Sequence, residues 1–445
     1  MSTPTPLSGF PELLPAQRFV ELEVLDTLRR IFELHGFSPV ETRAVEPLDQ
    51  LLRKGEIDKE VYVLRRLQAG RDEENSTLGL HYDLTVPFAR YVLENAGRLE
   101  FPFRRYQIQK VWRGERPQEG RYREFTQADI DVVGRAELPF HHDVEIARVM
   151  AEALAGLPFV PPLRLQVNNR KLIEGFYRGV GATDVGAVMR VIDKIDRVST
   201  TALTTMLTED AGLSAEQAAQ CRALAAIRTT DMSFVHRVRA LGVDHPLLDQ
   251  GLAELAPVVE GCVPLRGSRF EVQADLSIAR GLDYYTGTVF ETRMAGYDSL
   301  GSICSGGRYD SLASDGRTSY PGVGISLGVS RMLVPLLSRG GLRATRSVPS
   351  AVLVVVADEA SRLASEAVAA ALRARGVRVE VAPTAAKYGR QIRVAERRGI
   401  PFVWFPDSNE VKDIRSGEQW PADPASWLPP EDDRQPRVVA EQETE

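Results

Sequence analysis

A short stretch in the first third of the chain gathers arginines near an aromatic residue. Between Arg104 and Arg123 the sequence has seven basic residues against Glu115 and Glu119, a local charge of +5 (7 − 2). The basic residues are Arg104, Arg105, Lys110, Arg113, Arg116, Arg121 and Arg123. Guanidinium groups suit phosphate oxygens, and the ring of Phe125 suits a purine face. Alone, this pattern is about equally typical of a solvated hairpin with surface arginines.

A second segment, residues 322–331, is rich in glycine and ends with Arg331. Gly322, Gly324 and Gly328 permit close approach of a ligand or of a neighbouring backbone. Their spacing matches neither a dinucleotide-binding turn nor a P-loop lysine motif, so neither of those folds follows. Tight strand–helix packing is the stronger explanation of the glycines. Arg331, in an otherwise apolar segment, is harder to explain that way.

A third group of residues combines tyrosines with arginines and paired glycines. Residues 279–285 read ARGLDYY, with Arg280, Tyr284 and Tyr285, and residues 305–310 read SGGRYD. Such residues could line a pocket for a small polar ligand. The alternative is that the tyrosines are core residues of a sheet.

Hydrophobic periodicity predicts the elements that carry these residues. Residues 16–34 have helical spacing and end at Gly36, and residues 37–45 alternate as a strand does. The arginine-rich loop, residues 115–123, lies between two strand-like segments, which predicts an antiparallel hairpin with a basic tip. The strands predicted around it cover residues 106–112, 125–133 and 163–167.

The remainder of the chain changes character twice. Residues 169–259 are rich in Ala and Leu with helical periodicity, as in a helical insertion, and strand signals return afterwards. The predicted elements that follow are strands 270–276 and 288–292 and a helix at 326–337. After a linker, strands and helices alternate, which predicts a small α/β domain with a largely parallel sheet. Its elements are strand 351–356, helix 359–375, strand 377–381, helix 387–398 and strand 401–405.

Bulk properties limit the class of protein. A chain of 445 residues predicts two or three domains, and its net charge of −6 argues against a generic nucleic-acid binder. No apolar run reaches membrane-spanning length and the N-terminus lacks a secretory pattern, so no membrane association is expected. The three cysteines are far apart, which argues against a disulfide framework or a structural zinc cluster and fits the cytoplasm.

Taken together, the motifs resemble those of the histidyl-tRNA synthetase family, and they follow its order over nearly the whole chain. The arginine hairpin and the segment ending at Arg331 resemble motifs 2 and 3 of class II aminoacyl-tRNA synthetases. Residues 280–285 and 305–310 resemble the two signature segments of the histidine enzymes. Residues 80–87, LHYDLTVP, resemble the amino-acid-binding stretch, and residues 410–419 resemble part of the anticodon-binding domain. Several motifs together are far more specific than any one of them.

The resemblance implies an α+β catalytic domain built on an antiparallel sheet, a helical insertion, and a C-terminal α/β anticodon-binding domain. The expected boundaries are catalytic residues 1–168, insertion 169–259, catalytic residues 260–340, anticodon-binding residues 348–428 and a flexible acidic tail 429–445.

The resemblance also implies a role for individual residues. Catalysis would rest on the arginines Arg113, Arg280 and Arg331. ATP would contact Arg113, Glu115, Arg121, Phe125 and Arg331. Histidine would contact Asp83, Leu84, Thr85, Gln127, Asp131, Tyr284 and Tyr285. Transfer RNA would contact Arg116, Gln118 and Arg123 at the hairpin tip and Arg390 and Arg393 on a basic helix.

The implied reaction forms histidyl-adenylate from L-histidine and ATP with Mg²⁺ and then transfers histidine to its tRNA. The attacking carboxylate is already ionised, so the site needs arginines to hold two anions in line rather than a base. No protein-bound structural metal is expected, and the family resemblance implies a homodimer in the cytoplasm.

Three positions depart from the family pattern. Arg43 stands where motif 1 has proline, Ser330 stands where motif 3 has glutamate, and Asp131 replaces a longer glutamate. The alternative function is a catalytically silent, synthetase-like regulatory subunit of histidine biosynthesis. Such paralogues generally lose the ATP-binding arginines and the anticodon-binding domain, which this sequence keeps. A class II synthetase for another amino acid is disfavoured by residues 280–285.

Overall fold

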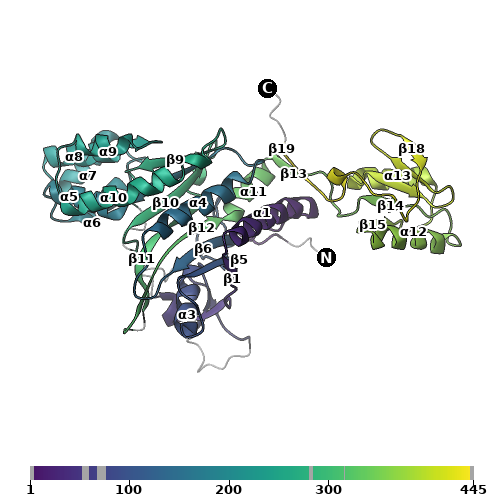
Figure 1. Ribbon diagram of the computed structural model, residues 1–445, viewed down its shortest axis with the longest axis horizontal. Coiled ribbons are helices and arrows are strands. Elements are labelled where there is room, and N and C mark those ends of the chain that lie inside the picture. The colour runs from purple at the N-terminus through teal and green to yellow at the C-terminus, as the bar shows by residue number, and fades with distance from the viewer. Residues whose placement is uncertain (1–4, 53–59, 68–76, 280–283, 315, 441–445) are drawn as a thin grey trace. The chain divides into compact units, whose positions relative to one another are not determined.

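The structure is a computed structural model that describes residues 5–52, 60–67, 77–279, 284–314 and 316–440. The chain divides into two compact units (Figure 1). The first comprises Met1–Pro11 and Leu25–Pro335, and the second comprises Glu12–Val24 and Leu336–Glu445.

The first unit is built on a nine-stranded sheet in the order β1-β5-β6-β12-β11-β10-β7-β9-β8. All neighbouring pairs are antiparallel except β1 with β5 and β7 with β9. The strands are β1 (Ser38–Pro39), β5 (Phe103–Trp112), β6 (Glu124–Val133), β7 (Leu163–Asn169), β8 (Arg228–Thr229), β9 (Phe270–Asp275), β10 (Thr288–Met294), β11 (Cys304–Ser314) and β12 (Ser319–Gly328). The antiparallel catalytic sheet expected from the sequence is therefore confirmed.

Helices and a small sheet surround these strands (Figure 1). The helices that lie wholly in this unit are α2 (Leu48–Leu51), α3 (Thr85–Asn95) and α4 (His141–Ala155), with a 3-10 turn η5 (Asp298–Leu300). The unit also contains the later part of α1 (Pro15–Leu34) and the earlier part of α11 (Val329–Ser338). A three-stranded sheet contains β2 (Val45–Pro47), β4 (Leu78–Leu80) and β3 (Val63–Leu64). Its Gly79 is packed closely, because a Cβ there would lie 2.9 Å from side chains of Leu48 and Val61.

The predicted helical insertion is present between β7 and β9. Its helices are α5 (Arg170–Gly179), α6 (Val185–Ile192), α7 (Thr200–Glu209), α8 (Ala215–Ala225), α9 (Ser233–Arg239) and α10 (Pro246–Gly261), followed by η4 (Val263–Leu265). Asn169 caps α5 by accepting a hydrogen bond from the backbone N–H of Lys171 at 2.9 Å. The short strand β8 was not predicted.

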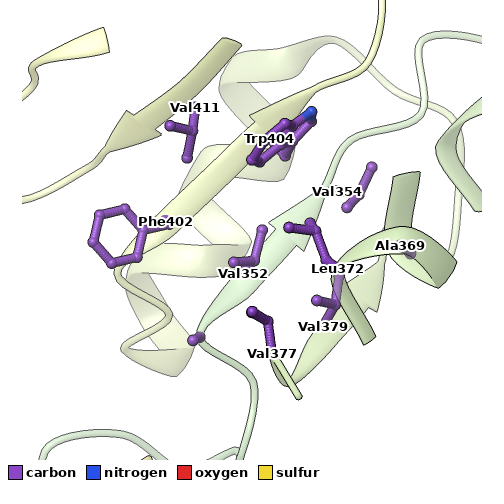
Figure 2. Close-up of a cluster of buried hydrophobic side chains, with 10 residues drawn as sticks. Val352, Val354, Ala369, Leu372, Val377, Val379, Phe402, Trp404 and Val411 are labelled. Carbon is purple, nitrogen blue, oxygen red and sulfur yellow. The ribbon is translucent and has the colours of Figure 1, made fainter. Parts of the chain in front are cut away.

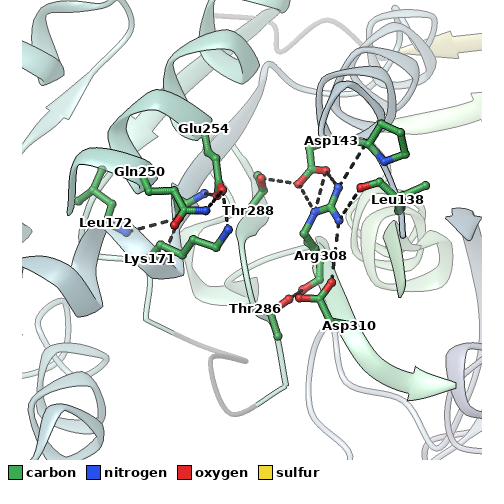
Figure 3. A network of polar contacts seen from close by, with 12 residues as sticks. Leu138, Asp143, Lys171, Leu172, Gln250, Glu254, Thr286, Thr288, Arg308 and Asp310 are labelled. Carbon is green, nitrogen blue, oxygen red and sulfur yellow. Dashed lines mark hydrogen bonds and ion pairs between the residues drawn. The ribbon is translucent and has the colours of Figure 1, made fainter. Parts of the chain in front are cut away.

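A polar network fixes several elements of the first unit to one another (Figure 3). Asp143 on α4 accepts from the Arg308 guanidinium of β11 at 2.6 Å and from the Thr288 hydroxyl of β10 at 2.6 Å. Beside it, the Lys171 ammonium of α5 donates to Glu254 of α10 at 2.5 Å. Because Asp143 and Arg308 are both buried, loss of either would leave an unpaired buried charge.

The second unit has a five-stranded sheet in the order β15-β14-β16-β17-β18. Its elements are β14 (Val352–Val354), α12 (Arg362–Ala374), β15 (Val379–Val381), α13 (Tyr388–Arg398), β16 (Phe402–Phe405), β17 (Glu410–Asp413) and β18 (Gln419–Pro421). β14 pairs in parallel with β15 and β16, and the last two strands are antiparallel. The predicted α/β domain is confirmed, and β17 and β18 add to it.

Side chains of the central strands alternate between two cores, one on each face of this sheet. Val352 and Trp404 pack with Leu372 of α12 (Figure 2). Leu353 and Val403 pack with residues of α13 on the other face. α12 and α13 therefore cover opposite faces.

Two sequence-based predictions need correction. The strand predicted at residues 37–45 is reduced to the short β1 and β2, because the Thr42 carbonyl and hydroxyl between them accept side-chain hydrogen bonds from Gln109 and Gln107 instead of joining a ladder.

The tail predicted as loose from residue 429 is structured as far as residue 440. It contains η6 (Glu431–Asp433) and β19 (Val438–Ala440), which pairs with β13 (Leu342–Ala344). Asp433 is buried and receives the Arg415 guanidinium through two contacts of 2.8 Å. Residues 441–445 lie outside the described residues.

Candidate active site

A polar cavity of about 470 Å³ lies in the first unit, beside the β5–β6 hairpin and the strands β10, β11 and β12. Most of the residues assigned to ATP and histidine from the sequence line this one cavity. They are Asp83, Thr85, Arg113, Glu115, Arg121, Phe125, Gln127, Tyr284, Tyr285 and Arg331. Residues separated by more than 200 positions along the chain therefore meet at one place.

The hairpin supplies cations beside an aromatic ring. The guanidinium carbon of Arg113 lies 5.1 Å from the centroid of the Phe125 ring, and its Nε donates to the Tyr82 carbonyl at 3.0 Å. Glu115 lies 3.9 Å from both Arg113 and Arg121. An anion entering here would meet two guanidinium groups that are already oriented by the protein.

Arg331 approaches the same cavity from α11. Its Nε donates to the Leu300 carbonyl at 3.1 Å, and a second nitrogen contacts the same oxygen. The preceding residue, Ser330, accepts from the backbone N–H of Thr126 at 2.9 Å. The serine at this motif 3 position thus joins α11 to the first residues of β6.

Hydrogen-bonding groups line the other side of the cavity. Asp83 accepts from the Val86 N–H at the start of α3 at 3.0 Å. Burial, and next the carboxylates Asp131 and Asp83, raise the pKa of Tyr285. Burial likewise raises the pKa of Tyr284. Both phenols therefore stay protonated at neutral pH and can donate to a ligand.

Asp131 is placed differently from the expectation that it contacts the ligand. It is buried behind the cavity and is not among the lining residues. Its carboxylate lies 2.6 Å from Arg105 and accepts from the Tyr309 hydroxyl at 2.9 Å. The shorter side chain at this position is thus engaged by protein groups.

The other site residues predicted from the sequence, as far as the structure describes them, do not line the cavity. Leu84 is fully buried, and Arg280 lies outside the described residues. Arg116 and Gln118 are exposed at the hairpin tip, whereas Arg123 is half-buried and donates to the Glu115 carbonyl at 3.2 Å. The other two, Arg390 and Arg393, are exposed on α13 of the second unit.

The sequence reading did not single out several residues of this region. Glu291, Ser305 and Ser326 line the cavity, and Arg105 and Asp129 lie behind it. A usable signal was present in β6, where polar residues at 127, 129 and 131 alternate with apolar ones at 128, 130 and 132.

The described part of the chain shows neither a clustered metal site nor a membrane-spanning helix. Within it, no three or more His, Cys, Asp or Glu side chains are grouped to hold a metal ion. No helix among these residues combines the length and apolar character needed to cross a bilayer.

Comparisons with known proteins agree along the chain. A family model described as histidyl-tRNA synthetase matches residues 9–332, and one described as an anticodon binding domain matches residues 350–417. Proteins named histidine–tRNA ligase from Cutibacterium acnes and Micrococcus luteus are each 58% identical, covering 98% of both chains and 100% of both chains, respectively. A crystal structure of histidyl-tRNA synthetase from Nostoc sp. PCC 7120 matches with a TM-score of 0.83 at 34% identity, over 94% of this chain and 96% of that one.

Proposed function

The chain belongs to the histidyl-tRNA synthetase family, and from that premise we infer that it is a histidine–tRNA ligase. We propose that it activates L-histidine with ATP to histidyl-adenylate and pyrophosphate, and then transfers histidine to the 3′ end of its tRNA. The observation that carries the activation step is the single cavity that Arg113, Arg331 and Gln127 share.

In this proposal the arginines bring two anions together. Arg113 holds the α-phosphate, Phe125 stacks on adenine with Glu115 and Arg121 beside it, and Arg331 holds the γ-phosphate. Arg280, which lies outside the described residues, is assigned to the α-phosphate by the family resemblance alone. Guanidinium groups stabilise the charge that develops when the histidine carboxylate attacks phosphorus.

Mg²⁺ accompanies ATP in the proposed reaction. Glu115 and Glu291 are carboxylates that line the cavity, which fits a cation usually bound by one or two carboxylates together with substrate phosphates. Bound there, Mg²⁺ would neutralise phosphate charge. The protein residues still have to orient both substrates.

The histidine side of the cavity reads the ligand by hydrogen bonds. Asp83, Thr85 and Gln127 address the α-ammonium, and Tyr284 and Tyr285 address the imidazole. Asp131 acts from behind, since Arg105 and Tyr309 engage its carboxylate. A ligand that left these buried polar groups unpaired would bind much more weakly.

Transfer RNA is proposed to meet both units. Arg116, Gln118 and Arg123 would meet the acceptor end, and the exposed Arg390 and Arg393 would face the anticodon side. We also propose a cytoplasmic homodimer. Arg43, at the usual motif 1 proline position, pairs with the buried Glu46 at 3.0 Å. Sedimentation of the purified chain tests whether it forms a dimer.

Histidine-dependent exchange between ATP and pyrophosphate, run beside the other standard amino acids, tests the activation step. Exchange with histidine alone is expected. Folded protein that binds histidine but gives no exchange would favour the regulatory-subunit alternative. The retained Arg113 and Arg331 and the anticodon-binding domain argue against that alternative.

A further inference from the structure

A polar stripe crosses three neighbouring strands behind the histidine side of the cavity. Backbone pairing aligns Arg105 of β5, Asp131 of β6 and Gly324 of β12 in one row. The next row aligns Gln107, Asp129 and Ser326. Because side chains two residues apart share a face of the sheet, the stripe continues to Gln127, which lines the cavity. The stripe therefore runs from the buried charges to the cavity.

One cation in this stripe serves two carboxylates. The Arg105 guanidinium is fully buried, lies 4.2 Å from the centroid of the Phe88 ring, and is 2.6 Å from Asp131 and 3.8 Å from Asp129. Burial raises the pKa of Asp129, and the Arg105 charge opposes that rise. Asp131 also accepts a hydrogen bond from the Tyr309 hydroxyl, so it has a partner besides Arg105.

The hydrogen bonds around Asp129 have only one consistent direction. If Asp129 is ionised beside Arg105, its carboxylate only accepts, and the Gln127 amide then presents its NH₂ to it, with Nε2 to Oδ1 at 3.2 Å. The same NH₂ contacts the Ser326 hydroxyl oxygen, and that hydroxyl donates to Asp129. Gln127 Oε1 then points the other way. It is buried and has no hydrogen-bond partner among the described residues.

We propose that Asp129, ionised near the Arg105 guanidinium, is a positioning residue that locks the Gln127 amide with its oxygen towards the ligand. In that orientation Gln127 accepts a hydrogen bond from the α-ammonium of histidine. With the amide turned over, its NH₂ would face the ammonium instead, donor against donor. The assignment rests on the proposed function in naming histidine as the ligand and in placing its α-ammonium at Gln127.

A pair of ligands isolates this contact. L-Histidine and 3-(imidazol-4-yl)propionate share the imidazole and the carboxylate, but only histidine has the ammonium. Their Kd ratio on the full-length chain, measured by calorimetry without ATP or tRNA, reports the contribution of the ammonium. An asparagine at position 129 can present either its oxygen or its NH₂, so it no longer fixes the direction of the Gln127 amide. Because the amide can then turn away from the ammonium, we predict that D129N lowers this preference for histidine by up to about 10- to 100-fold. The Kd of the propionate should change little.

Two further variants separate orientation from charge. S326A removes the other acceptor for the Gln127 NH₂ without changing any charge, and should also reduce the preference. E145Q is the matched control. Glu145 pairs at 2.9 Å with Arg104, which precedes Arg105 in β5 and points to the opposite face of the sheet. The preference for histidine over the propionate should therefore not change in E145Q.

A rescue variant completes the test. In D129N/Q127E, the carboxylate introduced at position 127 presents an acceptor oxygen to the ammonium in either orientation. The amide introduced at position 129 can donate to the other oxygen of that carboxylate. Most of the preference for histidine over the propionate should therefore return. A folded D129N with the wild-type ratio, or an S326A with the wild-type ratio, would overturn the proposal. If D129N does not fold, S326A and the double variant decide the matter.

The proposed catalytic function is tested separately by pyrophosphate exchange. Absent exchange with an intact, variant-sensitive Kd ratio would refute the activation step and leave this positioning role standing.

Discussion

Glycine at residue 324 shows how little space the residues behind the histidine pocket leave. A Cβ built there would lie 2.1 Å from Oδ1 of Asp131 and 2.6 Å from the Ile130 carbonyl. The Asp131 carboxylate cannot move far, because Arg105 and Tyr309 hold it. A methyl group at this position must therefore displace the polar stripe or the backbone of β6.

We expect G324A to destabilise the chain by about 1–3 kcal/mol, the usual cost of overpacking a filled interior. The KM for histidine should rise in parallel, because Asp131 and Gln127 lie in the same strand. G267A is the matched control, since nothing lies within 4 Å of a Cβ at that position. Thermal unfolding and exchange kinetics of the two variants check this. Equal behaviour would mean that the site tolerates the methyl group.

The elements themselves were predictable where local periodicity was strong. The β5–β6 hairpin, the insertion and the alternating strands and helices of the second unit all have patterns of period two or 3.6. Residues 37–45 have a strand pattern too, yet Thr42 bonds to side chains instead of a ladder. β17 and β18 were missed because short strands with polar residues such as Glu410 and Gln419 carry little apolar alternation.

The candidate site was predictable mainly through the family resemblance. It identified Arg113, Phe125 and Arg331, which a single motif would not have separated from surface arginines. It could not identify Arg105 or Asp129. The position proposed for these residues depends on the pairing of β5 and β6 with β12, which carries Ser326 and lies far away along the chain. Sequence spacing does not encode which residues meet across a ladder.

The basic helix α13 should affect charging of tRNA without affecting adenylate formation. Arg390 and Arg393 are exposed on α13, so R390A/R393A removes two charges that we propose meet tRNA phosphates, with little structural cost. R373A/R375A removes two exposed charges at the C-terminal end of α12, a helix that covers the opposite face of the sheet. We expect aminoacylation to fall severalfold, and more steeply at higher salt, only in the first variant. Equal charging by both variants would make α13 an ordinary solvated surface.

The end of the chain should depend on Asp433. D433A removes the carboxylate that binds Arg415 through two contacts, and should cost about 1–2 kcal/mol because Arg415 is half exposed and keeps Asp413. D432A is the control, since Asp432 and its partner Arg437 are both largely exposed. Limited proteolysis followed by mass spectrometry should show faster cleavage after residue 430 in D433A alone. Unchanged cleavage would show that the β13–β19 pairing suffices.

At the scale of the whole molecule, each unit has hydrophobic cores of its own. Phe88, Val92 and Tyr320 belong to one in the first unit, and Val352 and Trp404 belong to one in the second. Separate cores favour separate cooperative unfolding. The described residues that we propose bind ATP and histidine all belong to the first unit.

We therefore expect two calorimetric transitions, of which substrates shift only one. Histidine and a non-hydrolysable ATP analogue, each added at about 100 times its own Kd, should each stabilise the first unit by about 2.7 kcal/mol. The transition of the second unit should stay in place when both ligands are added. A single transition that moves as a whole would contradict this expectation.

The ladder between β13 and β19 places Leu342 opposite Ala440, so this part of the chain begins and ends at adjacent positions. Force applied to those two ends would open the ladder one hydrogen bond at a time, the mechanically weak direction. The same closeness of its ends makes residues 342–440 suitable as a cassette. It could be inserted into a surface loop of another protein without stretching either backbone.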